Sequence, residues 1–239
     1  MTPLDARVIG ALLSYQNESN IRGHLCEIGV HHGRLFLMLA LARRPGECSL
    51  AIDLFEDDRL NASTEHAGRD LAMFENARRL GVKLTDQEVF KTSSMGVEPA
   101  DILARATGPV RFYSIDGSHL YNGVENDLRL AERTLTPDGI IAVDDFFNPG
   151  WADVSFAVHD FLRRTDAIVP FAITPAKIYL APLRAAEKYK AALLRHARAA
   201  DTELVQVLGK ETLRLKQSAL RRGYDLLHNA IARYALRLA

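Results

Sequence analysis

The stretch that decides the fold of this 239-residue chain is HLCEIGVHHG, at residues 24–33. It begins with an apolar run typical of a buried strand and then turns through Gly29 and Gly33, after which Arg34–Arg43 has the apolar spacing of a helix. Glycine lets the chain turn tightly here and lets the backbone approach a ligand closely. The stretch therefore predicts a strand, a glycine turn and a helix, the first unit of an α/β fold.

The same alternation of short apolar runs and helical spacing continues to residue 181. The further strand-like runs are Leu50–Leu54, Glu88–Lys91, Val110–Ile115, Gly139–Val143, Ile168–Ile173 and Lys177–Ala181. The further helical stretches are Asp70–Leu80, Glu98–Ala106, Gly123–Thr134 and Val154–Arg164. This alternation predicts a Rossmann-like, mostly parallel sheet of roughly seven strands with helices on both faces. Only three residues separate the last two runs, too few for a helical crossover, so one strand should be antiparallel.

Charge is divided unevenly along the chain, whose formal net charge is +0. From residue 184 onward there are 12 Lys and Arg against 5 Asp and Glu, a balance of +7, which leaves −7 for residues 1–183. Strong helix formers fill this tail, and no proline follows Pro182. We therefore predict one domain over residues 1–183 and a basic helical extension over residues 184–239.

The end of the extension carries an apolar stripe with 4-3-4-3-4 spacing. Its members are Leu220, Tyr224, Leu227, Ile231, Tyr234 and Leu238. We expect this stripe to pack on the first domain or on another subunit. Packing on another subunit would form a homo-oligomer, which is the state that we expect. Contact with an anionic membrane surface is the less favoured alternative.

The composition limits which partners and which cellular location we expect. A balanced chain gives no reason to expect bulk binding of nucleic acid. No apolar run approaches the roughly 18 residues that cross a bilayer, and the first residues do not resemble a signal peptide, so we expect a cytoplasmic protein. Cys26 and Cys48, the only two cysteines, lie in apolar runs and are predicted to be buried thiols rather than a disulfide.

Candidate binding residues follow the predicted strands, because ligands of open parallel sheets bind beyond the carboxyl ends of the strands. Glu27, Gly29 and Gly33 form the pattern E-x-G-x-x-x-G after the first strand. Asp53 ends the second strand, where its carboxylate either accepts the hydroxyls of a ribose or caps the next helix.

Three aspartates follow the fourth and fifth predicted strands. If these strands are neighbours, about 4.8 Å apart, then Asp116 meets Asp144 and Asp145 at one edge of the sheet. Carboxylates packed together repel one another unless a cation neutralises them, and Mg²⁺ prefers such oxygen ligands. The alternative is that Asp144 caps a turn and Asp145 faces water. His119 lies in the same loop as Asp116 and is a candidate general base, with a solvent-exposed role as its alternative.

Together these motifs resemble class I S-adenosylmethionine-dependent methyltransferases. They are Glu27-x-Gly29 with Gly33, Asp53, Ile115-Asp116-Gly117-Ser118-His119-x-Tyr121, and Leu135-x-Pro137-x-Gly139 before Asp144-Asp145. More narrowly, the chain is similar to the metal-dependent sugar O-methyltransferases of macrolide and aminocoumarin tailoring. The resemblance covers Arg22 to Leu162, about three-fifths of the chain.

The resemblance implies an activity and a role for each motif. The activity is transfer of the methyl group of S-adenosylmethionine to a hydroxyl of a sugar or glycosylated small molecule. The cofactor site would comprise Glu27, Gly29, Gly33, Asp53, Ser93, Ser94 and Asp116. Asp116, Asp144 and Asp145 would bind Mg²⁺ or another divalent cation, and His119, with Asp116 beside it, would be the catalytic base.

Two further segments have predicted roles, and two other functions are alternatives to this hypothesis. The aromatic loop at residues 146–151 forms either a wall for the acceptor or a clamp on the next helix. The polar segment Glu56–Arg69 is long for a connection and is predicted to be a lid. A catechol- or phenol-type O-methyltransferase and a non-catalytic scaffold with a degenerate cofactor fold are the alternatives.

Overall fold

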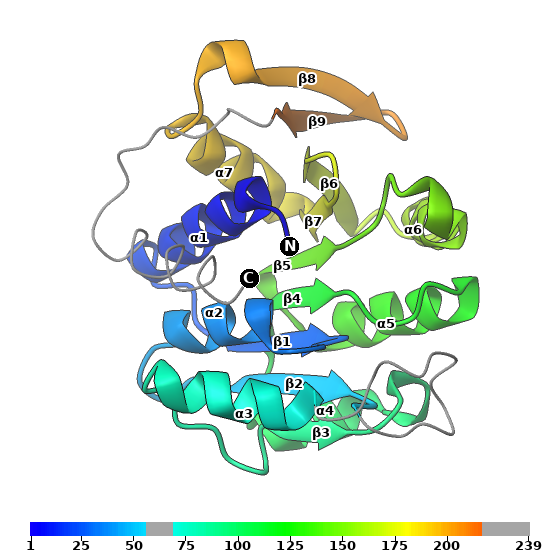
Figure 1. The fold of residues 1–239 in the computed structure, drawn as a ribbon. Helices are drawn as coiled ribbons and strands as arrows, with labels where there is room; N and C mark the ends of the chain where they lie inside the picture. Colours follow the sequence, from blue (N-terminus) through cyan, green and yellow to red (C-terminus); the bar gives the residue numbers. More distant parts are fainter. Residues whose placement is uncertain (56–68, 217–239) are drawn as a thin grey trace.

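The computed structural model describes residues 1–55 and 69–216, in which one sheet lies between two layers of helices (Figure 1). The strands are β1 (His24–Ile28), β2 (Ser49–Asp53), β3 (Val89–Lys91), β4 (Val110–Ile115), β5 (Leu135–Val143), β6 (Ile168–Ile173), β7 (Ile178–Pro182), β8 (Thr202–Val207) and β9 (Lys210–Leu215). The α-helices are α1 (Pro3–Glu18), α2 (Arg34–Ala42), α3 (Arg69–Arg79), α4 (Pro99–Ala106), α5 (Tyr121–Thr134), α6 (Ala152–Arg164) and α7 (Leu183–Leu194). Single 3₁₀ turns are η1 (Ser94–Gly96), η2 (Pro149–Trp151) and η3 (Ala199–Asp201).

The sheet has nine strands in the order β3-β2-β1-β4-β5-β7-β6-β9-β8. The strands from β3 to β5 run parallel, and β7 is antiparallel to both of its neighbours. The predicted α/β class, the adjacency of the fourth and fifth strands and the antiparallel pairing of β6 with β7 are therefore confirmed. The predicted number of strands was too low by two, because β8 and β9 extend the sheet beyond β6.

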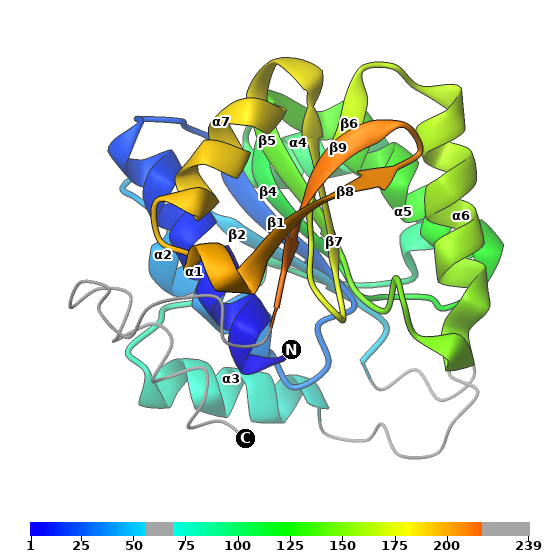
Figure 2. The same ribbon diagram turned by 90° about the horizontal axis from the view of Figure 1, so that it is seen from above.

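Helices cover both faces of the sheet (Figure 2), and side chains of the central strands alternate between a core on one face and a core on the other. On β4, Phe112 packs in the core beneath α1, α2 and α7, and Tyr113 packs in the core beneath α4, α5 and α6. Both faces are apolar because helices cover both, which explains why the central strands read as continuous apolar runs. Both cysteines are free; Cys26 is buried in the second core as predicted, whereas Cys48 is only partly buried, so the prediction of a buried thiol is wrong there.

The first helix was not predicted, although its start carries a clear signal. Thr2 caps α1 by accepting a hydrogen bond from the backbone of Asp5, and Pro3 occupies the first turn. The helix packs beside α7, where the rings of Tyr15 and Tyr189 meet edge to face at 5.6 Å.

The prediction of helix over residues 184–239 is wrong for residues 202–215, which form the hairpin of β8 and β9. Leu208 and Gly209 connect the two strands with φ of 48° and 74°. A two-residue turn with positive φ at both positions matches the twist of a hairpin, and it overrides the helix propensity of the flanking residues. The segment is therefore helical only in α7, apart from the 3₁₀ turn η3, as far as the described residues reach.

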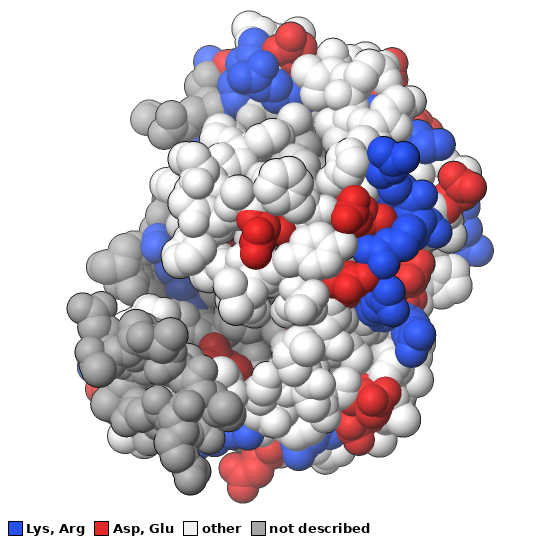
Figure 3. All heavy atoms as spheres, turned by 90° about the vertical axis from the view of Figure 1, so that its right-hand side faces the viewer, with Lys and Arg blue, Asp and Glu red and all other residues white. Residues whose placement is uncertain are grey.

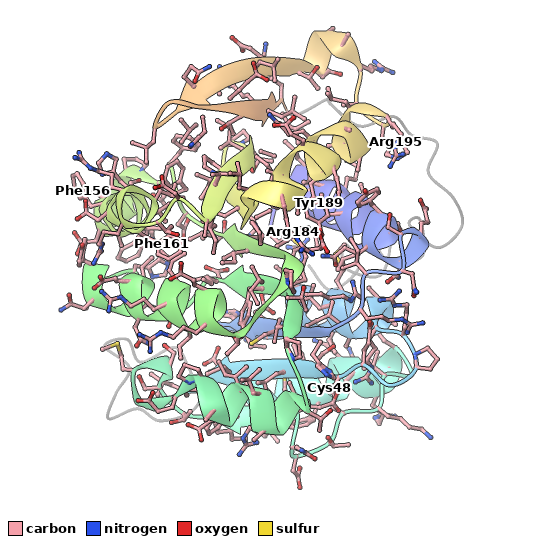
Figure 4. All side chains as sticks on the ribbon, turned by 180° about the vertical axis from the view of Figure 1, so that it is seen from behind. Cys48, Phe156, Phe161, Arg184, Tyr189 and Arg195 are labelled. Atoms are coloured by element: carbon pink, nitrogen blue, oxygen red, sulfur yellow. The ribbon has the colours of Figure 1, made fainter. Side chains whose placement is uncertain are left out.

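The predicted boundary at residue 184 falls between elements that share one core. Tyr189 and Leu193 of α7 pack with Phe171 of β6 and with Leu213 of β9. Seen from behind, Arg184 and Tyr189 lie over the start of β5 (Figure 4), where Arg184 Nε donates to the carbonyl of Pro137 at 3.0 Å. Residues 184–215 thus continue the layered fold.

Two predicted features lie outside the described residues. They are the predicted lid Glu56–Arg69, except for its last residue, which begins α3, and the apolar stripe from Leu220 to Leu238. Within the described ranges, no helix combines the length and the apolar character needed to cross a membrane.

Candidate active site

The candidate site is built on the aligned carboxyl ends of β1, β4 and β5. Ile28 pairs with Ile115, and Ile115 pairs with Val143, so the residues that follow these strands begin side by side. The amide of Asp116 donates to the carbonyl of Ile28 at 2.8 Å, and the amide of Asp144 donates to that of Ile115 at 2.9 Å. The strand ladder therefore holds both aspartates at one edge. Figure 3 shows this side of the molecule, where acidic side chains lie among uncharged ones.

Gly29 is required by the closeness of the neighbouring strand. Its φ is 83°, and a Cβ at this position would lie 2.0 Å from the carbonyl oxygen of Asp116. Gly33, with φ of 80°, has a different constraint, because a Cβ there would lie 2.5 Å from Cγ of Met73 on α3. The first glycine lets β1 approach β4 at the site, and the second lets α3 pack against the turn.

Asp53, at the end of β2, organises the glycine turn. Its Oδ2 accepts the amides of Val30 at 2.5 Å and His31 at 2.9 Å, and its Oδ1 accepts the amide of Phe55 at 2.7 Å. Two roles were considered from the sequence, a ribose acceptor and a cap of the next helix. The structure adds a third, in which the carboxylate fixes the backbone of the preceding loop.

Glu27 is a buried carboxyl group in the middle of β1. Its side chain is almost fully buried, and Oε2 has no hydrogen-bond partner among the residues that the structure describes. Burial, and then the charge of Asp116, raise the pKa of Glu27 well above its ordinary value. A buried acceptor without a donor is costly, and it marks a place where a donor from a ligand fits.

A buried lysine is the counter-charge of the aspartates. Lys177 is fully buried, and its Nζ lies 2.6 Å from Oδ2 of Asp144. Burial opposes the ionisation of Asp144, but the ammonium outweighs burial and lowers the pKa of this carboxyl group. For Asp116, burial outweighs the attraction of Lys177, and with the nearby Asp144 it raises the pKa to about 7. The two aspartates therefore differ in charge near neutral pH.

His119 and Asp145 form a pair at the mouth of the site. His119 Nε2 lies 3.1 Å from Asp145 Oδ2, and the imidazole stacks on Trp151 with ring centroids 4.3 Å apart. One ligand atom each from Asp116, His119 and Asp145 lie within 4.8 Å of one another, which is close enough to share a cation. The predicted metal residues are thus only partly brought together, because Asp144 faces Lys177 instead.

The predicted adenine residues lie on the neighbouring loop. Ser93 caps the 3₁₀ turn η1 by accepting the amide of Met95, and the carbonyl of Ser94 accepts from Asn126 of α5 at 2.9 Å. The predicted aromatic loop lies beside His119. Phe147 and Trp151 are about half exposed there, and Leu120 is exposed next to His119 in sequence.

The sequence pattern did not point to Lys177, because ligand sites are expected beyond the carboxyl ends of strands. Lys177 stands at the amino end of the predicted strand Lys177–Ala181. Since β7 runs antiparallel to β5, the residue before its first position lies at the carboxyl edge of the parallel strands. The signal was the antiparallel pairing itself, which had been predicted.

The sheet order, the glycine turn after β1 and the acidic residues after β2, β4 and β5 define a Rossmann-like class I methyltransferase fold. Within this class, the chain belongs to the family described as methyltransferase domain, whose profile matches residues 26–146. No curated protein matches the sequence.

Solved O-methyltransferases have similar folds. CalS11, a TDP-rhamnose 3'-O-methyltransferase of calicheamicin biosynthesis, is 21% identical, with a TM-score of 0.52 over 71% of this chain and 78% of that chain. The O-methyltransferase NovP is 17% identical, with a TM-score of 0.54 over 74% of this chain and 79% of that chain. An O-methyltransferase from Bacillus cereus, solved with SAH, is 14% identical, with a TM-score of 0.53 over 75% and 80% of the two chains. At these identities the likeness concerns the fold.

Proposed function

We propose that this protein is an S-adenosylmethionine-dependent O-methyltransferase that methylates a hydroxyl of a sugar or glycosylated small molecule. The observation that carries the proposal is the pairing of His119 with Asp145 beside Asp116, at the edge of the sheet where this class of fold binds its ligands. A base held by a carboxylate next to further acidic groups suits removal of a proton from a hydroxyl.

Glu27, Gly29 and Asp53 are the proposed centre of the cofactor site. S-adenosylmethionine, when bound, supplies the methyl group on a positively charged sulfur. The unpartnered Oε2 of Glu27 suits an ammonium donor such as that of the methionine part. Asp53 fixes the amides of Val30 and His31, so the loop that would border the cofactor is held in place before binding. Ser93 and Ser94 remain the proposed neighbours of the adenine.

His119 is the proposed general base. A hydrogen on Nε2 that is donated to Asp145 leaves Nδ1 as the acceptor of a proton from the acceptor hydroxyl. Trp151 packs on one face of the imidazole and restricts its rotation. Asp145 and Trp151 therefore hold the base in one orientation, which lowers the entropy cost of reaching the reactive geometry.

A divalent cation is the second proposed group at this site, and the residues present fit it in part. When bound, such an ion lowers the pKa of a hydroxyl and stabilises the oxygen that loses its proton. Asp116 and Asp145 offer carboxylate oxygens next to His119, consistent with the preference of Mg²⁺ for oxygen ligands. Asp144, the third predicted ligand, already forms an ion pair with Lys177.

The proposed acceptor class rests on the rings beside His119. Aromatic faces pack well against the apolar faces of sugar rings and against planar phenols. Phe147 and Trp151 present such faces on the exposed side of the site. A solved protein of similar fold, CalS11, is by its description a TDP-rhamnose 3'-O-methyltransferase, which favours the sugar over the phenol.

Calorimetry with S-adenosylhomocysteine, followed by a methyl-transfer assay, tests the proposed function. We expect the purified chain to bind S-adenosylhomocysteine and to transfer one methyl group to a hydroxyl in a panel of glycosides and nucleotide sugars, detected by mass spectrometry. A parallel panel of catechols decides between the two acceptor classes. A chain that binds neither S-adenosylhomocysteine nor S-adenosylmethionine would be a scaffold, and the proposal would be wrong.

A further inference from the structure

Lys177 occupies an unusual position for a lysine. The side chain is fully buried, and it enters the site from the turn between β6 and β7. Its Nζ lies 2.6 Å from Oδ2 of Asp144, and Asp116 and Asp5 add to the negative charge around it. Lysine is rarely buried unless it is paired, so the site is built around this ammonium group.

Both carboxylate oxygens of Asp144 are already in use. Oδ2 faces the ammonium of Lys177, and Oδ1 accepts the amide of Asp145 at 3.0 Å. A divalent cation at Oδ2 would have to displace a buried ammonium or stand beside its positive charge. At such short range in a buried site, repulsion between like charges is strong.

Asp145 differs from Asp144 in the character of its partners. Its Oδ1 accepts from the side-chain amide of Asn148 at 3.0 Å, and its Oδ2 faces His119. Neither partner is a buried ammonium group of the kind that faces Asp144. About a quarter of the Asp145 side chain is exposed, against a tenth for Asp144, so a hydrated ion reaches it more easily.

We propose that Lys177 is the internal counter-ion of Asp144, which removes Asp144 from the set of cation ligands and leaves Asp116 and Asp145 to hold the ion. Lys177 is in this sense a positioning residue. The inference rests on the proposed function, since it concerns the cation of that same site. Two carboxylates are sufficient for Mg²⁺, which usually keeps several waters or substrate oxygens in its remaining positions.

A cation titration on four variants tests this assignment. Mn²⁺ serves as the spectroscopic probe, and free ion is measured by electron paramagnetic resonance with S-adenosylhomocysteine present. Asp145→Asn removes a proposed ligand. The double variant Asp144→Asn/Lys177→Met removes the buried pair together, so that no unpaired charge remains. Asp144→Asn alone is a second test should the double variant fail to fold. Asp166→Asn, at an exposed aspartate before β6, is the control for binding elsewhere.

The expected result is a clear separation between the two aspartates. Asp145→Asn should weaken Mn²⁺ binding by about 100-fold or more, beyond the range of losses in the outer shell of a metal site. The double variant and Asp144→Asn should each weaken it by no more than about tenfold, the lower end of that range. The Asp166→Asn control should bind as the wild type does.

Three results would overturn the inference. One is a loss in the Asp144 variants as large as that in Asp145→Asn, which would make Asp144 a ligand. Another is retention of full Mn²⁺ affinity in Asp145→Asn. The third is absence of Mn²⁺ binding to the wild type. Calorimetry with S-adenosylhomocysteine on the same samples tests the proposed function separately. Failure to bind S-adenosylhomocysteine would overturn the methyltransferase proposal but not the assignment of the residues that bind the cation.

Discussion

The two ends of the sheet each contain a buried cation, and the two cations are satisfied to different degrees. At the amino end, Arg111 makes a two-point contact with Glu47, at 2.9 and 3.2 Å. It also donates to Gln16 at 2.7 Å and to the carbonyl of Ala42 at 3.3 Å. Gln16 in turn donates to the carbonyl of Arg111 at 2.9 Å, so this cluster is closed.

At the carboxyl end, Lys177 forms its ion pair with Asp144, and Oε2 of Glu27 has no hydrogen-bond partner within the described part of the chain. Buried polar groups in folded proteins are nearly always paired. The closed cluster is therefore explained by stability, and we propose that groups of the bound ligands complete the open one.

The largest expected effect is on turnover. His119→Ala removes the proposed base and should lower kcat by about 10²- to 10⁴-fold, the usual contribution of general base catalysis. Asp145 and Asp116 stay in place, so affinity for S-adenosylhomocysteine should change little. Initial rates and calorimetry measure the two quantities. A variant with wild-type kcat would remove His119 from the mechanism.

Replacement of Arg111, the cation of the closed cluster, should lower the stability of the protein and leave its affinity for the cofactor unchanged. Arg111→Met leaves Glu47 with Arg44 as its remaining cation but removes the donors to Gln16 and to the carbonyl of Ala42, and should reduce the free energy of unfolding by about 1–3 kcal/mol. Arg184→Met, at an exposed ion pair with Asp138, is the matched control and should cost less than about 1 kcal/mol. Urea unfolding measures both. A large loss of cofactor affinity in folded Arg111→Met would contradict the separation of the two ends.

Glu27→Gln should have the opposite effect to Arg111→Met: it should weaken cofactor binding and leave stability intact. Replacement of the unpartnered carboxyl group removes a charged acceptor for the cofactor and should weaken S-adenosylhomocysteine binding by about 1.5–3 kcal/mol. Stability should not fall, because the native protein makes no hydrogen bond to Oε2 that the substitution could break. Calorimetry and thermal unfolding separate the two quantities. Unchanged affinity would place the cofactor elsewhere.

The last effect is a slope in the dependence of stability on pH, which is small for each pH unit but accumulates across the window. The pKa of Asp116 rises from 3.8 to about 7 on folding, so between these values the native protein holds a proton that the unfolded chain has released. The free energy of unfolding should therefore fall as pH rises through this window, by at most about 1.4 kcal/mol per pH unit from this group. Asp116→Asn should flatten the slope measured by urea unfolding. An equal slope in both proteins would assign the effect to other groups.

Much of the fold was predictable because periodicity is a local signal. The strands from His24–Ile28 to the antiparallel pair of β6 and β7 follow from short apolar runs, and the convergence of Asp116 with Asp144 follows from strand adjacency. The hairpin of β8 and β9 was misread because helix formers dominate the sequence on both sides of it. Its strand signals are short: Val205 and Val207 favour a strand, and Leu208-Gly209 forms the turn.

Most members of the candidate site were predictable, but Lys177 and the pairing of the aspartates were not. Which carboxylate faces a cation depends on a lysine that is 33 residues away from Asp144 in the sequence and comes from a strand of opposite direction. Similarly, the sequence places Asp53 at a strand end but does not show that the amides of the glycine turn already occupy it. Such contacts are set by tertiary packing.

The stack of Trp151 on His119 gives the protein a fluorophore of its own at the site. Trp151 is the only tryptophan in the chain, so its emission reports on a single place. An imidazolium quenches indole emission more strongly than a neutral imidazole does, and a ring displaced by a ligand leaves the indole in a new environment. Protonation of His119 and binding of an acceptor can therefore both be followed by the fluorescence of Trp151, without an added label and without turnover.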